Sequence, residues 1–155
     1  MNGWLWLHLL GVLLAVGNIV TAAFWKVQAD RSGQPAVAHA AARNVMLADY
    51  AFTIPGLILI VVSGSMMAER AGMSLTGLNW LTLSLVLFAI SGIIWGIFLI
   101  PLQRRMIRLS AECVAEGRLS QAYRAASRSW AIYGTIATLL PIVILYLMVM
   151  QPHLL

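Results

Sequence analysis

The feature that most limits how this chain folds is a set of four apolar runs, each a little over 20 residues long. They cover about residues 4–25, 46–67, 80–100 and 130–150. A helix of about 20 apolar residues crosses a hydrocarbon core of about 30 Å. Apolar residues make up 61% of the chain and charged residues 10%, whereas a soluble domain is about half apolar and a quarter charged. We therefore expect residues 1–155 to form a single all-α membrane domain with four spans.

The ends of the runs carry the aromatic residues that mark a membrane–water interface. Five of the six tryptophans lie at or near a run end: Trp4, Trp6, Trp25, Trp80 and Trp130. The first run is not preceded by the basic segment of a signal peptide, because residues 1–7 contain no Lys or Arg. It is therefore expected to be a retained span.

The basic residues predict which side of the membrane each loop occupies. Nine of the ten follow the first or the third run, and only Arg70 follows the second. The nine are Lys26, Arg31, Arg43, Arg104, Arg105, Arg108, Arg118, Arg124 and Arg128. The positive-inside rule then places these loops in the cytoplasm and both termini outside. Basic residues beside spans are an ordinary signal for orientation, so we expect anionic lipid, and no nucleic acid, as their partner.

Both basic connections have helix-forming compositions. The first is rich in alanine and has Pro35 near its start, where a helix tolerates proline. The second is helical in composition, is broken near Gly117, and has Ser120 as a candidate cap for the segment that follows. The expected architecture is an integral membrane antiparallel four-helix bundle with helical cytoplasmic extensions.

Each span has one stripe of small and polar residues, which in a membrane bundle marks the face that packs on other helices. The stripes of the first two spans place Asn18, Thr21, Asp49 and Thr53 in a polar bundle core. Asp49 has two interpretations. It could form an ion pair with Lys26 or Arg128 at a similar depth, or it could relay protons.

Three further features of the spans suggest bends or close packing. Pro55 and Pro141 each remove a backbone donor, which predicts either a tolerated kink or a kink that opens a ligand pocket. Gly92 and Gly96 have the spacing of a close helix approach, within the bundle or in a homodimer.

His8 is the only histidine inside a predicted span. It could bond to a neighbouring helix, or it could bind haem or a metal through its neutral imidazole. Six of the eight methionines lie toward the level of His8: Met1, Met66, Met67, Met73, Met148 and Met150. Thioethers with imidazole suit copper, and a His/Met pair can hold haem iron. The candidate cofactor ligands are His8, Met66 and Met67, and the candidate metal ligands are His8, Met67 and His153.

Motifs for other chemistry are missing from the sequence. It contains no phosphate loop, dinucleotide fingerprint, zinc-protease helix or nucleophile elbow. Cys113 is the only cysteine, so no intrachain disulfide can form.

Four segments together resemble a family of predicted bacterial integral membrane proteins known as domain-of-unknown-function family 2269. They are LHLLGVLLAVGNIVTAAFWK, LADYAFTIPG, SGIIWGIFLIPLQRRM and YRAASRSWAIYGTIATLLP. The resemblance implies four spans in a bacterial inner membrane and implies no activity. The first span, with a histidine near its start and a small-residue stripe, is also similar to that of HemJ-type haem-b-dependent protoporphyrinogen oxidases and of copper-resistance D-type membrane domains. That similarity implies a ligand role for His8.

Three functions remain open from the sequence. The first is a haem- or copper-associated redox or metal-handling protein that uses His8. The second is a small transporter or transporter subunit, working as a homodimer, with a path along Asn18, Thr21, Asp49 and Thr53. The third is a non-catalytic membrane assembly or partner-binding protein that uses the basic extensions.

Overall fold

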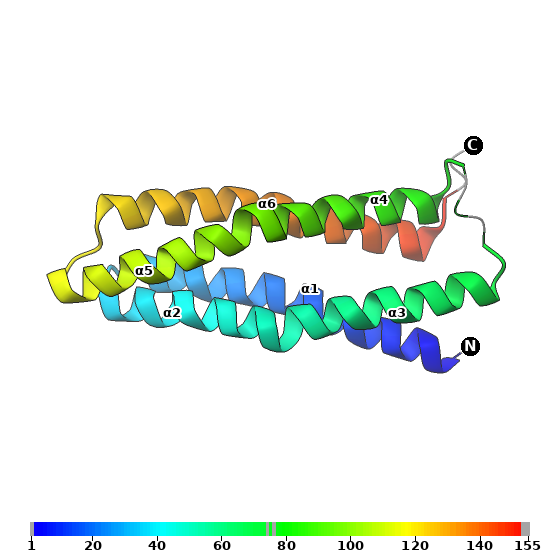
Figure 1. The fold of residues 1–155 in the computed structure, drawn as a ribbon, viewed down its shortest axis with the longest axis horizontal. Helices are drawn as coiled ribbons and strands as arrows, with labels where there is room; N and C mark the ends of the chain where they lie inside the picture. The colour runs from blue at the N-terminus through cyan, green and yellow to red at the C-terminus, as the bar shows by residue number, and fades with distance from the viewer. Residues whose placement is uncertain (1, 74, 76, 153–155) are drawn as a thin grey trace.

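The computed structural model describes residues 2–73, 75 and 77–152 (Figure 1), and these residues contain helices and no strands. The α-helices are α1 (Asn2–Arg31), α2 (Pro35–Ala48), α3 (Ile54–Arg70), α4 (Trp80–Ile93), α5 (Ile100–Glu116) and α6 (Gln121–Met150). Two π-helical turns, η1 (Asp49–Thr53) and η2 (Ile94–Leu99), join α2 to α3 and α4 to α5 without a break in the helix.

Four helices in the described part of the chain are long and apolar enough to cross a membrane, as the sequence predicts. The two that contain π turns, Pro35–Arg70 and Trp80–Glu116, have 36 and 37 residues. At 1.5 Å per residue each is about 54 Å long, which exceeds a hydrocarbon core of about 30 Å. The helices therefore extend beyond the spans into the two basic connections, which confirms the predicted helical extensions.

Local signals in the sequence set the helix ends in the basic connections. Pro35 lies in the first turn of α2, where its missing N–H costs nothing. Gly117 ends α5 in the left-handed conformation, with φ of 73°, which glycine adopts without strain. The Ser120 hydroxyl caps α6 by accepting a hydrogen bond of 3.2 Å from the Tyr123 N–H. The predicted cap at Ser120 is confirmed.

The four long helices are antiparallel and pack differently at the two ends of the bundle. At the basic end α2 lies on α5, and α5 lies on α6. Toward the end where the chain termini lie, α1 packs along α3, and α4 packs along α6 (Figure 1). Among the described residues, the backbone of α3 does not closely approach α4 or α6, nor does that of α1 approach α4. The bundle is therefore joined at its basic end and divides into two helix pairs beyond it.

The buried apolar cluster lies mainly toward the basic end. Ala38, Met106, Cys113 and Tyr123 are all nearly inaccessible and belong to one cluster. The apolar residues of the spans are largely exposed, including Leu13 at 69%. Exposed aliphatic side chains on a span are expected where lipid, and not protein, covers them.

The closest approach between two spans is the contact of α1 with α3. An added Cβ at Gly56 would lie 2.8 Å from the Gly11 carbonyl oxygen and 2.8 Å from the Ala15 nitrogen. Gly92 and Gly96, in contrast, have no atom within 4 Å of such a position. The predicted close approach at Gly92 and Gly96 is therefore wrong for the interior of this bundle, and only its dimer form stays a prediction.

The Gly11–Gly56 contact generates a stability prediction. Gly56→Ala forces two backbones apart, and we expect it to lower the free energy of unfolding by about 1–3 kcal/mol. The matched control is Gly92→Ala, which adds the same methyl group at an open position and should be neutral or slightly stabilising. Thermal unfolding in a mild detergent measures both. Equal midpoints for the two variants would contradict the packing described here.

Candidate functional site

A buried polar network surrounds the carboxylate of Asp49 at the start of η1. Asp49 is 7% exposed and Thr53, one turn later, is 1% exposed. Oδ1 of Asp49 accepts hydrogen bonds from Asn18 Nδ2 of α1 at 3.2 Å and from Thr53 Oγ1 at 2.9 Å. Asn18 Nδ2 also lies 3.0 Å from Thr53 Oγ1. The three side chains therefore form one connected group between α1 and η1.

The second oxygen of the Asp49 carboxylate faces the other half of the bundle. Oδ2 accepts a hydrogen bond of 2.8 Å from Gln103 Nε2 of α5 and a longer one of 3.5 Å from Trp95 Nε1 of η2. Gln103 is itself buried. One carboxylate thus accepts from four neutral side chains and connects α1, η1, η2 and α5.

The ion pair predicted for Asp49 is wrong. No basic nitrogen of the described residues lies within 4.0 Å of its carboxylate. Lys26 is instead paired with Asp30, one turn further along α1, at 2.5 Å. Asp30 lies four residues after Lys26 on the same helix, so the two side chains are neighbours without further ordering of the chain. Lys26 therefore pairs with Asp30 and not with Asp49.

The Asp49 network lies inside the membrane part of the bundle. Asn18 is 14 residues from Trp4 and 7 from Trp25, the two interfacial tryptophans of α1. At 1.5 Å per residue it is about 21 Å from the first and about 10 Å from the second. Asp49 shares this depth because it is bonded to Asn18. An ionisable residue at such a depth is costly to bury and usually has a function.

Two π turns meet at the carboxylate. Asp49 begins η1, and Trp95 belongs to η2. Each turn is followed closely by a proline, Pro55 or Pro101, which lacks the N–H that a regular helix would need there. Such π turns occur often at functional sites, because they redirect side chains and free backbone groups. Pro141, in contrast, lies within the continuous helix α6.

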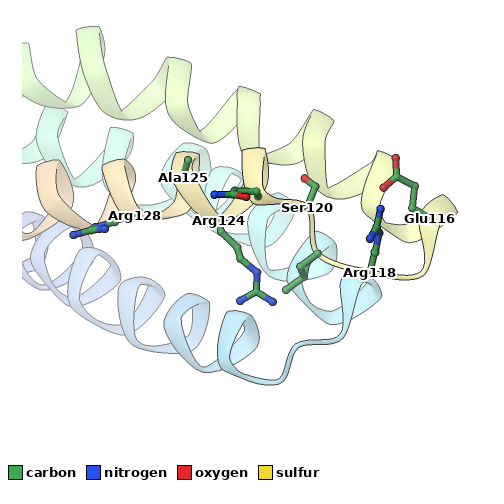
Figure 2. Close-up of a pocket in the computed structure, with 8 residues that line it drawn as sticks. Glu116, Arg118, Ser120, Arg124, Ala125 and Arg128 are labelled. Atoms are coloured by element: carbon green, nitrogen blue, oxygen red, sulfur yellow. The ribbon is translucent and has the colours of Figure 1, made fainter.

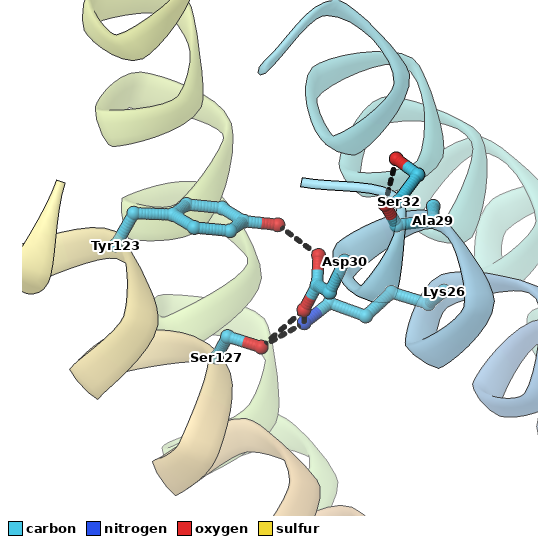
Figure 3. Close-up of polar contacts among 6 residues, drawn as sticks. All are labelled: Lys26, Ala29, Asp30, Ser32, Tyr123 and Ser127. Carbon is cyan, nitrogen blue, oxygen red and sulfur yellow. Dashed lines mark hydrogen bonds and ion pairs between the residues drawn. The ribbon is translucent and has the colours of Figure 1, made fainter. Parts of the chain in front are cut away.

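A second polar cluster joins α1 to α6 nearer the basic end (Figure 3). The Lys26 ammonium is 1% exposed and pairs with Oδ2 of Asp30. It also donates to the Ser127 hydroxyl, which in turn donates to Asp30 Oδ2 at 2.5 Å. The Tyr123 hydroxyl donates to Asp30 Oδ1 at 2.6 Å. The charge of Lys26 is therefore compensated inside the bundle.

Aromatic rings complete the surroundings of Lys26. Its Nζ lies 5.0 Å from the Trp130 ring centroid and 5.7 Å from that of Tyr123, which are cation–π distances. The Trp130 indole N–H is buried and has no hydrogen-bond partner among the described residues. Ser127 and Trp130 therefore both face the bundle interior.

His8 lies half-buried against α3, close to Gly64. Its Nδ1 is 3.2 Å from the Ile60 carbonyl oxygen and 3.1 Å from Ser63 Oγ. The Ser63 hydroxyl gives its own proton to the Leu59 carbonyl, so it acts as an acceptor toward the histidine. Both neighbours therefore favour a proton on Nδ1, which leaves the Nε2 lone pair available.

The remaining candidate residues have different surroundings. Met66 and Met67 are half-buried near the end of α3. Thr21 is exposed, and its hydroxyl bonds to the Gly17 carbonyl of its own helix at 2.8 Å, so it lies outside the polar core. The described residues contain no group of three or more His, Cys, Asp or Glu side chains able to hold a metal. His153 lies outside the described residues.

Two members of the Asp49 network, Trp95 and Gln103, were not predicted as site residues. Trp95 belongs to the inward stripe of the third span, but Gln103 follows the predicted end of that span at residue 100. The two are eight residues apart, which is close to two helical turns and so places them on one face. Continuing the helix face that contains Trp95 past the third apolar run, which ends at residue 100, includes Gln103.

The fold and the buried polar groups define a four-span helical membrane protein with an ionisable core. A family model described as "Predicted integral membrane protein (DUF2269)" matches residues 4–152. The chain belongs to this family. No curated protein and no solved structure matches it, so its similarity to the haem-dependent oxidases and copper-resistance domains stays a prediction.

Because Lys26 and Asp30 form an ion pair, replacing Lys26 alone should lower the stability of the protein more than replacing both residues. Lys26→Met leaves Asp30 without its cation, and we expect a loss toward the lower end of about 3–5 kcal/mol, since the Asp30 side chain is 21% exposed. Lys26→Met combined with Asp30→Asn removes both charges and should recover part of that loss. The thermal unfolding midpoints of the wild type, the single variant and the double variant in detergent measure these losses. A double variant no more stable than the single one would rule out a dominant role for the charge pair.

Proposed function

We propose that this protein is a small membrane carrier, or a carrier subunit, whose working step uses reversible protonation of Asp49. The observation that supports this function is a buried carboxylate held only by neutral donors at membrane depth. A charge in such a place is expensive without a cation beside it. Adding a proton removes that charge and with it the cost of burying an ion.

Protonation changes what the carboxylate can bind. An ionised carboxylate only accepts hydrogen bonds, but a protonated one donates through one oxygen. If the proton sits on Oδ2, the bonds from Gln103 and Trp95 weaken, and these are the bonds to η2 and α5. The proton would then loosen the junction at which the two helix pairs diverge. That is the coupling a carrier needs between an ion and a change of access.

The proposal includes an orientation in the membrane and an oligomeric state. The basic end would face the cytoplasm of a bacterial inner membrane, with both termini outside. Asp49 would then lie nearer the cytoplasmic surface. Four spans are few for an independent carrier, so a homodimer is part of this proposal.

The direct test is an infrared titration of the reconstituted protein. Spectra recorded at acidic and alkaline pH should differ by a protonated-carboxyl C=O band from a buried acid, and Asp49→Asn should lose that band. Glu112→Gln, which removes an exposed carboxylate of α5, is the matched control and should keep it. A band that survives Asp49→Asn, or no such band in the wild type, would refute reversible protonation of this residue.

A second candidate function, haem or copper chemistry at His8, is supported by the hydrogen bonds of Nδ1. A ligating histidine commonly donates its other ring N–H to a backbone carbonyl, and His8 is arranged in this way with Ile60. Nε2 would be the ligand atom, and Met66 or Met67 could contribute a thioether. A bound haem or copper ion would supply the electron-transfer chemistry.

This second function predicts that the purified wild type carries the cofactor and that His8→Ala does not. The measurement is visible absorption, oxidised and reduced, with iron and copper analysis of the same sample. The control is His39→Ala, because His39 lies at the basic end, where its Nδ1 is 2.9 Å from Ser110 Oγ. A wild type without haem and copper, or equal cofactor content in both variants, would eliminate a cofactor role for His8.

A further inference from the structure

The surface at the turn between α5 and α6 forms an open groove of about 730 Å³ (Figure 2). Three arginines line it: Arg118 in the turn, and Arg124 and Arg128 on the first turns of α6. Glu116 is the only acidic residue in the lining. The groove therefore carries a net positive charge and is independent of the Asp49 network.

The three guanidinium groups are not neutralised by the protein itself. Within the described residues, Arg118, Arg124 and Arg128 form no ion pair, and no hydrogen bond of their side chains occurs. Asp30, which lies beside α6, is already bonded to Lys26, Ser127 and Tyr123. The acidic groups near the groove therefore do not satisfy its cations.

The start of α6 adds further donors to the same groove. Ser120 and Gln121 both line it, and the Ser120 hydroxyl satisfies the Tyr123 N–H. The first backbone N–H groups of a helix have no partner within the helix, and the helix dipole places partial positive charge there. These donors strengthen the attraction for an anion that the arginines already create.

The position of the groove along α6 makes it accessible to anions of the membrane surface and to anions in solution. Arg128 is two residues before the start of the fourth apolar run, so it lies near the headgroup layer. Arg124 lies one turn, about 6 Å, further from the membrane, and Arg118 lies beyond it. The groove is thus open both to a lipid headgroup and to a solute.

From this geometry we propose that the groove is a binding site for a phosphate group. A planar guanidinium donates two parallel hydrogen bonds to phosphate oxygens, and a cluster of arginines is a usual way to bind that group. The phosphate could belong to an anionic lipid or to a soluble phosphorylated compound. The shared chemistry is the same, and the two sources can be separated by experiment.

The test compares two probes and two triple variants of the full chain. Arg118→Gln/Arg124→Gln/Arg128→Gln empties the groove of cations, and Arg104→Gln/Arg105→Gln/Arg108→Gln removes the same charge from exposed positions of α5. Pyrophosphate is titrated calorimetrically into protein in neutral detergent. Phosphatidylglycerol is compared with phosphatidylcholine by native mass spectrometry of the same sample.

We expect binding of at least one probe to weaken about fivefold for each groove arginine removed, with the α5 variant close to the wild type. Pyrophosphate binding with this pattern would identify a soluble ligand, and a preference for phosphatidylglycerol with this pattern would identify a lipid. Failure of the wild type to bind either probe would overturn the proposal. An equal loss in both triple variants would also overturn it, because it would show a general charge effect.

Discussion

Burial of the Asp49 carboxylate inside the membrane part of the bundle is the constraint on which the rest of the structure depends. A carboxylate at this depth requires hydrogen-bond donors, because a hydrocarbon core does not solvate it and no basic nitrogen of the described residues lies within 4.0 Å of it. The chain supplies Asn18, Thr53, Trp95 and Gln103, which come from segments far apart in the sequence. The side chains that satisfy this one group thereby fix how α1, η1, η2 and α5 lie relative to one another.

The same network marks the boundary between two kinds of packing. On its basic side the helices extend beyond the membrane and enclose a well-buried apolar cluster, and Lys26 ties α1 to α6. On the other side α1 packs on α3 and α4 packs on α6. Among the described residues the backbone of α3 does not closely approach α4 or α6, and that of α1 does not approach α4. Asp49 therefore lies where the joined end of the bundle meets the two separate helix pairs.

Much of this arrangement could be predicted from the sequence, because lengths and periodicities determine it. The four apolar runs predicted the four spans, and the inward stripes predicted that Asn18, Asp49 and Thr53 would meet. The ion pair predicted for Asp49 does not form because Asp30, one turn from Lys26 on the same helix, takes the lysine instead. Gln103 is missing from the predicted site because it lies beyond the apolar run that ends at residue 100, although it shares a helix face with Trp95.

The central claim is that the Asp49 carboxylate holds the two helix pairs together, and a distance between the pairs tests it most directly. Spin labels on Ser65→Cys of α3 and Val86→Cys of α4, both exposed, would be placed in a Cys113→Ala background. Electron-resonance distances would then be compared in lipid with Asp49 present and with Asp49→Leu, which removes both carboxylate oxygens that accept hydrogen bonds in the network. The account predicts a narrow distribution for the first protein and a shifted or broader one for the second. Identical distributions would contradict it.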